Sequence, residues 1–249
     1  MNVDVRFSDG AVFADIMRAV SLLVDEASLV FDAEGLRMNA MDPAHVVLVV
    51  LNLPRDRFEE YRVEGGRVFV NLNMRDFMRF LRRGGETPLS MLFDAEKNRL
   101  NLMFQEGGRS KSFSLKTYET LLEPTPIPRL SFSSEVVIDM QTFKQAVEDC
   151  FLVDDVLRIK ASTDALVFSA GNPSENTYSM RVGKDGPTLQ RLECSEPTAA
   201  SYSLVYLEKI VDGCHPLADT VSLAFTSNKP MRISVSDEAL TYFIAPRLD

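Results

Sequence analysis

The feature that most constrains the fold is an internal duplication. Residues 21–41 read SLLVDEASLVFDAEGLRMNAM, and residues 150–171 read CFLVDDVLRIKASTDALVFSAG. Each segment begins with the end of an amphipathic helix. That end reads Leu-Val-Asp and is followed by a second acidic residue. Both then continue through an alternating strand, a short polar turn and a second strand. Val24 and Val153 therefore stand 129 residues apart in equivalent positions.

A second pair of segments repeats this spacing. Residues 71–104 and 201–236 each read as a helix, a turn, a strand, a polar turn and another strand, and Leu81 lies 129 residues before Ile210. Because the same spacing recurs far along the chain, the sequence indicates two copies of one structural module rather than a chance likeness of one segment.

Each module is predicted to hold two helices and many short alternating strands, which gives an α+β fold with antiparallel sheets. The four expected helices cover residues 10–24, 73–83, 140–152 and 203–212. Their apolar faces are expected to point inward, with Val12 and Phe151 among the inward residues. The strands expected in the first module are VDVRF, SLVFDA, LRMNAM, HVVLVVLNL, RVFVNL, PLSMLF, RLNLMF and KSFSLK.

A proline-rich segment separates the two modules. Residues 118–132 read YETLLEPTPIPRLSF, with prolines at 124, 126 and 128. Proline fixes φ and lacks the N–H donor, so this segment is predicted to be an extended, semi-rigid connector. The expected organisation is a module over 1–117, a connector over 118–131 and a module over 132–249.

The helix expected at 73–83 carries a concentration of arginine in an acidic chain. The formal net charge is -9, shared as -1 over residues 1–117 and -8 over residues 118–249. Arg79, Arg82 and Arg83 nevertheless lie within five positions. Such a cluster is often an ordinary solvated face, but in an acidic chain it favours an anionic partner.

Few residues suggest catalysis. The two histidines are His45 and His215, and no phosphate-binding loop, GxGxxG or GxSxG pattern occurs. Cys214 and His215 are adjacent in sequence, and adjacent residues in a turn rarely converge as a nucleophile and its base. We therefore expect no catalytic residue, no cofactor and no metal site.

Cysteine content and hydropathy bear on the cellular compartment of the chain. Three cysteines without a CxxC pair indicate neither a disulfide framework nor a zinc site. No apolar run approaches the ~18–20 residues that cross a bilayer. The first residues, MNVDVRFSDG, lack the pattern of a signal peptide. These features predict an intracellular protein with no membrane partner.

Several motifs together resemble the DNA sliding clamps, the proliferating cell nuclear antigen family in its archaeal form. They are NAMDPAHVVLVVLNLP at 39–54, LVDEA at 23–27, FMRFLRRG at 77–84, IPRLSF at 127–132 and IAPRL at 244–248. The resemblance spans the whole chain. It implies a clamp fold of two repeated modules, each a helix pair on curved antiparallel sheets, and a ring of three subunits through which double-stranded DNA passes.

The resemblance also implies residues that hold DNA. Arg79 and Arg82 match basic positions of the family's second helix, and Arg83 extends the cluster. Arg18, Lys144 and Lys209 are further candidates on the corresponding inner faces. Glu148, Val205 and Asp212 stand where the family has basic residues, so the second module is expected to contribute less to DNA binding.

A partner-binding pocket is implied on the outer surface, beneath the connector. It would take short peptides with a glutamine and an aromatic pair, carried by DNA polymerase, clamp loader, flap nuclease and ligase. The matching positions are Met41, His45, Val46, Leu48, Ile127, Pro128, Pro230, Phe243, Ala245 and Pro246. For His45, Val46 and Leu48 an ordinary structural role is an open alternative.

Subunit contacts are implied between an edge strand of one module and an edge strand of the next subunit's other module. The matching segments are 109–116 and 175–182, with Arg109, Lys111, Phe113, Tyr178 and Met180 as contact residues. The implied function is a processivity clamp and scaffold, cytoplasmic in an archaeal cell or nuclear in a eukaryote. Two alternatives stay open: a specialised subunit of a heterotrimeric or checkpoint-type clamp, and an α+β enzyme without a recognisable motif.

Overall fold

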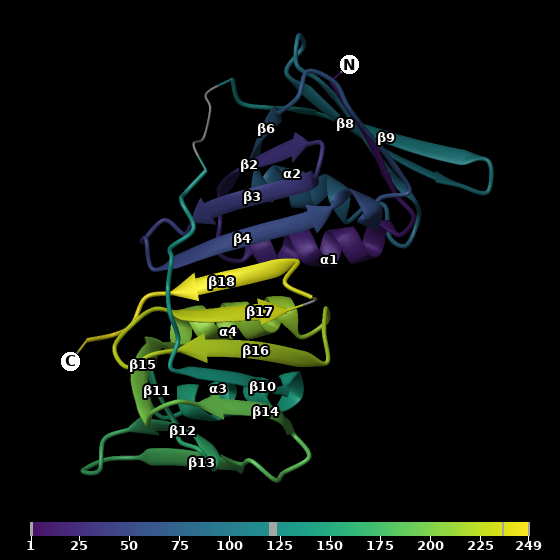
Figure 1. Cartoon of the computed structure of the whole chain (residues 1–249). Coiled ribbons are helices and arrows are strands. Elements are labelled where there is room, and N and C mark those ends of the chain that lie inside the picture. Colours follow the sequence, from purple (N-terminus) through teal and green to yellow (C-terminus); the bar gives the residue numbers. More distant parts are fainter. Residues whose placement is uncertain (1, 120–123, 236, 249) are drawn as a thin grey trace. The chain divides into compact units, whose positions relative to one another are not determined.

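The computed structural model describes residues 2–119, 124–235 and 237–248. The chain divides into two compact units: the first comprises Met1–Pro43 and Val49–Ile127, and the second comprises Ala44–Leu48 and Pro128–Asp249. Each unit holds a pair of helices against antiparallel sheets (Figure 1).

The first unit contains two sheets. One has the order β5-β1-β7-β8-β9, and the other runs β6-β2-β3-β4. Its helices are α1 (Gly10–Ser21) and α2 (Met74–Leu81), with a short 3₁₀ turn at Arg55–Arg57. The strands are β1 (Val3–Phe7), β2 (Glu26–Asp32), β3 (Gly35–Met41), β4 (Val47–Pro54), β5 (Glu60–Val63), β6 (Val68–Asn73), β7 (Leu89–Asp94), β8 (Arg99–Glu106) and β9 (Arg109–Lys116).

The second unit repeats this order with each strand number raised by nine. Its sheets run β14-β10-β16-β17-β18 and β15-β11-β12-β13. Its helices are α3 (Met140–Phe151) and α4 (Leu204–Cys214). The strands are β10 (Ser134–Asp139), β11 (Val156–Ala161), β12 (Ala165–Gly171), β13 (Thr177–Gly183), β14 (Leu189–Cys194), β15 (Thr198–Ser203), β16 (Thr220–Phe225), β17 (Met231–Val235) and β18 (Leu240–Ile244). The predicted duplication and α+β class are confirmed. Equivalent positions lie 130 residues apart rather than the 129 that the sequence indicated: α1 begins at Gly10 and α3 at Met140, and α2 begins at Met74 and α4 at Leu204.

Each unit has its own core beneath its helices. In the first unit the fully buried aromatic rings include Phe13, Phe77 and Phe104; in the second, Phe143 and Tyr202. Burial of rings of this size contributes about 2–3 kcal/mol each, so each helix is held mainly by its apolar stripe.

Two inward assignments from the sequence are wrong. Val12 is 54% exposed on α1, and Phe151 is 36% exposed at the end of α3. Each lies roughly 75–90° from the centre of its helix's buried stripe and in a terminal turn, at the margin of the packed face. Helix α1 also ends at Ser21 rather than continuing to 24, because Leu22 caps it and the chain turns toward β2.

One strand of the first unit is absent from the sequence expectations. Strand β5 pairs with β1 at the edge of the five-stranded sheet, with Val63 opposite Val3. Its sequence, EYRV, is short and largely polar, and none of its residues is fully buried. Its residues do not alternate clearly between apolar and polar. Such a segment becomes a strand because it pairs with a neighbour, and its own sequence pattern does not reveal it.

Candidate functional site

Helix α2 presents a basic surface that its own sequence orients. The Asn73 side chain accepts a hydrogen bond from the Asp76 N–H at 3.1 Å, which caps the helix. The inner face is buried and consists of Met74, Phe77, Met78 and Leu81. The arginine stripe, which we define as Arg75, Arg79, Arg82 and Arg83, is exposed on the outer face. Burial of the apolar face therefore fixes the direction in which the four guanidinium groups point.

Contacts within the stripe leave it accessible. Arg79 pairs with Asp76 at 3.4 Å, and both side chains are more than half exposed. Its guanidinium carbon also lies 4.7 Å from the Phe80 ring centroid. Such an exposed pair contributes at most about 1 kcal/mol, so a phosphate can replace Asp76 at little cost. The part of the chain that the structure describes holds no acidic partner for Arg82 or Arg83.

The remaining predicted basic residues are placed differently. Arg18 is half-buried on α1. Lys144 on α3 is paired with Glu148 one turn later. Lys209 on α4 is exposed and lies 5.9 Å from the Tyr206 ring centroid. Among the four helices of the described residues, α2 alone gathers several basic groups on one face.

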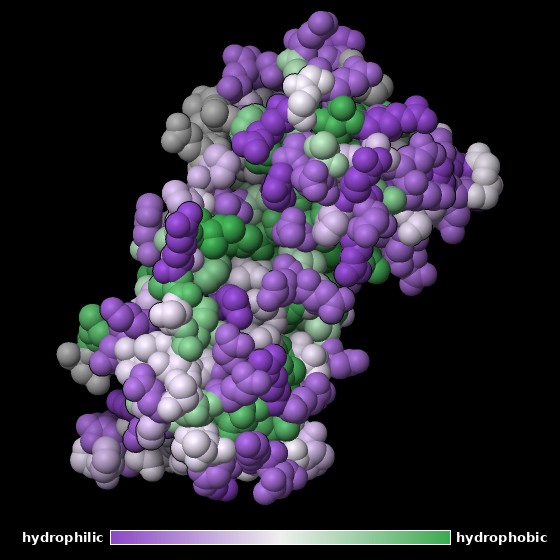
Figure 2. Space-filling view, in the orientation of Figure 1, coloured by the Kyte–Doolittle hydropathy of each residue, from purple (hydrophilic) through white to green (hydrophobic). Residues whose placement is uncertain are grey.

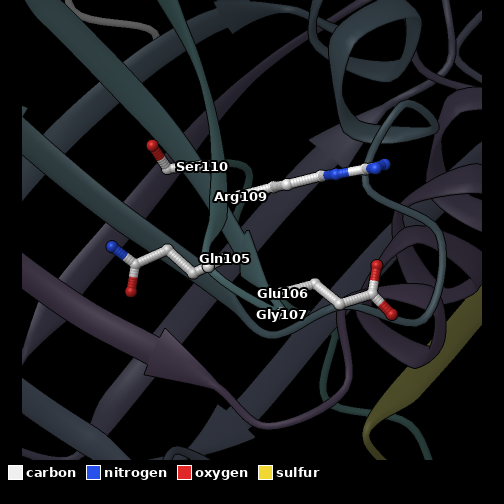
Figure 3. A pocket seen from close by; sticks show the side chains of 6 residues that line it. Gln105, Glu106, Gly107, Arg109 and Ser110 are labelled. Carbon is white, nitrogen blue, oxygen red and sulfur yellow. The ribbon is translucent and has the colours of Figure 1, made fainter.

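Strand β9 forms an open edge of the first unit. It pairs with β8 and ends its sheet, and Arg109 and Lys111 are exposed along it. At the hairpin tip a shallow hollow of about 400 Å³ is lined by residues 105–110. Glu106 and Arg109 point to one side of the tip and Gln105 and Ser110 to the other (Figure 3). Hydrophilic side chains dominate this hairpin on the face shown in Figure 2.

An aromatic cluster lies where α2 meets β9. The half-buried Phe113 ring lies 5.2 Å from Phe80, centroid to centroid, and 6.3 Å from Phe104. Lys111 Nζ donates a hydrogen bond to the Arg83 carbonyl oxygen at 3.1 Å. The edge strand and the end of the arginine stripe are therefore held together by direct contacts.

Strand β13 forms the corresponding open edge of the second unit. Tyr178 and Met180 are half-buried on it, and β12 is its only neighbour in the sheet as described. The Tyr178 hydroxyl donates to Asp149 Oδ2 on α3 at 2.9 Å. Burial, reinforced by this carboxylate, raises the pKa of Tyr178 to about 12.

An exposed apolar pair sits beside β13. Helix α3 contacts this strand, and its last turn carries Phe151 and then Leu152, which is 85% exposed. Sequence reasoning missed this pair, as it missed Phe80, because it assigned Phe151 to the core. The available signal was an apolar residue just outside the buried stripe in a helix's last turn.

Most of the predicted peptide pocket belongs to the second unit. Ala44–Leu48 is part of that unit, and the Ala245 N–H donates to the Val46 carbonyl oxygen at 2.9 Å. Phe243, Ala245 and Pro246 are half-buried. Because Met231 pairs with Ile244, Pro230 lies at the level of Ala245. These residues present a partly exposed apolar surface.

Three other pocket positions in that unit behave differently. Leu48 is 4% exposed and packs in the core, which is the structural alternative that the sequence left open. His45 is exposed with φ 58°, a left-handed turn conformation, and Pro128 is exposed. Met41 and Ile127 belong to the first unit, where Met41 is half-buried and Ile127 is 49% exposed.

The adjacent Cys214 and His215 point to different partners. Cys214 Sγ contacts the buried Tyr242 hydroxyl at 3.4 Å, whereas His215 Nε2 lies 2.9 Å from Gln141 Oε1. Burial raises the pKa of Cys214 to about 12, which keeps the thiol protonated. These two residues therefore do not form a nucleophile and base. Within the described ranges no three metal-ligating side chains cluster, and no helix could span a membrane.

Comparisons with known proteins agree with this arrangement. Residues 2–122 match the model of the proliferating cell nuclear antigen N-terminal domain, and residues 126–247 match that of its C-terminal domain. The chain is 33% identical to a DNA polymerase sliding clamp of Thermococcus gammatolerans over the full length of both, and 31% identical to one of Methanococcus maripaludis, covering 95% of this chain and 96% of the relative.

A solved structure is similar over nearly the whole chain. The crystal structure of PCNA from Thermococcus kodakaraensis superposes with a TM-score of 0.90 at 26% identity, covering 98% of this chain and all of the other.

Proposed function

The chain belongs to the proliferating cell nuclear antigen family, and from that premise we propose that it is a subunit of a DNA sliding clamp. A ring built from it would encircle double-stranded DNA and tether DNA polymerase. The observation that carries the proposal is the arginine stripe: four exposed guanidinium groups on one helix face of a chain whose formal net charge is -9. We propose that this face lies toward the DNA.

The chemistry of the stripe suits a protein that must slide. Arginine contacts to phosphate are strong but carry no sequence information, since every phosphate looks alike. These arginines are exposed and do not enclose a phosphate in a pocket. They can therefore exchange one phosphate for the next at low cost. Acidic charge elsewhere on the chain would keep its outer surface off the DNA. We propose Arg79, Arg82 and Arg83, with Arg18 beside them, as the DNA-contacting residues.

Ring closure would use the two open edges. Strand β9 ends its sheet in the first unit, and β13 ends its sheet in the second unit. We propose that β9 of one copy pairs with β13 of the next. Such a head-to-tail contact closes a ring when the rotation suits, and three two-module subunits suit a threefold ring.

The side chains at these edges complement one another. Arg109 and Lys111 give β9 positive charge. Asp149 lies beside β13. The Phe80–Phe113 pair would cover Phe151 and Leu152 of the next copy and remove them from water.

Partner enzymes would dock on the partly exposed apolar surface of the second unit. A partly preformed apolar site is offered by Phe243, Ala245, Pro246 and Pro230. The connector at Pro128 is stiffened by proline, so it would lose little conformational entropy when a peptide binds. We propose that peptides with a glutamine and an aromatic pair bind here, in DNA polymerase, clamp loader, flap nuclease and ligase. The chain would act as a scaffold without catalysis of its own, in the cytoplasm of an archaeal cell.

The proposed division of labour follows the sequence boundaries. Residues 1–117 would form the module that grips DNA, residues 118–131 the connector that borders the peptide site, and residues 132–249 the module that carries most of that site.

Retention on circular DNA tests the clamp function. The chain is loaded by its clamp loader onto nicked circular duplex, separated from free protein on a sizing column, and half the sample is cut once with a restriction enzyme. A clamp stays with the circle and leaves the linear product. A chain retained equally on both, or on neither, is not a clamp by itself. Retention that appears only when sister chains are added identifies a subunit of a heterotrimer.

A further inference from the structure

The two units present helix faces of opposite charge. Around α1 and α2 the outward-facing charged groups are five basic and two acidic, a net of +3: Arg18, Arg75, Arg79, Arg82 and Arg83 against Asp15 and Asp76. Around α3 and α4 they are two basic and three acidic, a net of -1: Lys144 and Lys209 against Glu148, Glu208 and Asp212. The half-buried Asp149 accepts from Tyr178 on β13 and is not counted. The fold is duplicated, but the charge is not.

We infer that, in each subunit, DNA phosphates are contacted by the helices of the first unit alone, and that the helices of the second unit form a wall of net negative charge that holds no phosphate. This inference rests on the proposed clamp function. It revises the expectation that Lys144 and Lys209 contact DNA.

The position of the charges on α2 and α4 supports the inference. Asn73 and Ser203 are the N-caps of these helices. Counted from the cap, Arg75 corresponds to Val205 and Arg82 to Asp212. Val205 is 43% exposed. One guanidinium is thus replaced by an apolar side chain and another by a carboxylate on the equivalent face.

The one basic position that α4 keeps is flanked by acids. Lys209 corresponds to Arg79, but it follows Glu208 directly and Asp212 lies three residues later on the same helix. Its ammonium lies 5.9 Å from the Tyr206 ring centroid. A phosphate that approached Lys209 would come within a Debye length, about 8 Å at physiological salt, of both carboxylates.

On α3 the single lysine already has a partner. Lys144 pairs with Glu148 four residues later, and its side chain is only 25% exposed. Asp149 adds a further negative charge and accepts from Tyr178. For Lys144 to bind a phosphate, its ion pair must be broken and Glu148 left facing the DNA. Both steps oppose binding, so the electrostatic gain from this lysine is close to zero.

Charge variants measured across a salt series test the inference. Binding of the assembled protein to a short labelled duplex is followed by fluorescence anisotropy, and the slope of log K against log[salt] reports the number of neutralised phosphates at about 0.9 for each. Changing Arg79, Arg82 and Arg83 to alanine lowers this slope by about 0.9 for every phosphate that is no longer neutralised. Lys144→Ala and Lys209→Ala leave it unchanged. A slope that falls as much per lysine removed as per arginine removed overturns the inference.

A gain-of-charge variant tests the cause. Glu148→Lys combined with Asp212→Lys converts the acidic wall to a basic one on the same helices, and we expect a steeper slope and tighter binding. An unchanged slope would show that charge is not what keeps this face from the phosphates, and would also overturn the inference. If the wild-type protein neither binds the duplex nor stays on circular DNA, the clamp function itself fails, which is a different result.

Discussion

Leu152 offers the sharpest test of ring closure. It is 85% exposed in the single chain, so Leu152→Asp removes little that the isolated fold depends on. If the β9–β13 contact covers it, burial contributes about 2 kcal/mol to each subunit contact, and a buried carboxylate would add a further penalty. A loss of about 2 kcal/mol weakens each contact about 30-fold. Every subunit carries the change, so each contact of the ring is affected.

Light scattering on a sizing column, over a dilution series, measures the effect. A closed ring of wild-type chains has about 84 kDa, three times the 27.9 kDa chain. The variant is expected to dissociate at a concentration at least about 30-fold higher. Circular dichroism before and after heating establishes that the variant folds.

Val205→Asp is the matched control. Val205 is also an exposed apolar residue on a second-unit helix, at 43%, but it lies on α4 and away from the two edge strands in sequence and topology. It should leave the mass unchanged. If Leu152→Asp and Val205→Asp dissociate alike, or if Leu152→Asp keeps the wild-type mass at every concentration, the proposed interface is wrong.

Three further predictions concern single side chains. Phe243→Asp should weaken binding of a peptide with a glutamine and two aromatic residues by at least about 30-fold, as measured by fluorescence titration. The variant should still stay on circular DNA in the retention assay. Gly84→Ala should lower the free energy of unfolding by about 1–3 kcal/mol in urea, since the added Cβ would lie 2.0 Å from Cε1 of the buried Phe104 ring; Gly183→Ala, whose Cβ meets nothing closer than 3.5 Å, should cost little. Tyr178→Phe should cost about 1 kcal/mol near neutral pH. Because the folded pKa of Tyr178 is raised to about 12 from 10, the wild-type advantage should be present below pH 10 and vanish as the pH rises toward 12, and a gap that persists at high pH would contradict the role of this hydroxyl.

Local rules predicted the parts of the structure that depend on local sequence. The Asn73 cap, the buried stripe of α2 and the exposed arginines all follow from hydrogen bonding and periodicity within one helix. The hairpin turn at Gly107 and Gly108 has both residues at positive φ, as a tight two-residue turn requires. The repeat spacing predicted that two such modules exist, and the strand orders agree with it.

The sequence failed where a neighbour decides the outcome. Periodicity locates the centre of a helix's buried stripe but not its margins, so Val12 and Phe151 were assigned inward although both are exposed. For Leu48 the sequence left both a pocket role and a core role open, because alternation along a strand does not say which face a ligand reaches, and the residue is buried. Strand β5 was missed because its pairing with β1, rather than its own residues, makes it a strand.

The duplication separates what the fold needs from what the function uses. Both α2 and α4 bury leucine, isoleucine or other apolar groups on one face, with Leu81 and Val211 almost fully buried, because each unit needs that stripe to hold its helix. The opposite face is exposed in both helices, and there Arg82 corresponds to Asp212. The α2 face therefore carries arginine for a reason outside the unit's own stability: four like charges on adjacent turns repel one another and cost stability unless a partner neutralises them. Under the proposed clamp function an external polyanion would provide that neutralisation, and the acidic counterpart on α4 shows that the same backbone position tolerates the opposite charge.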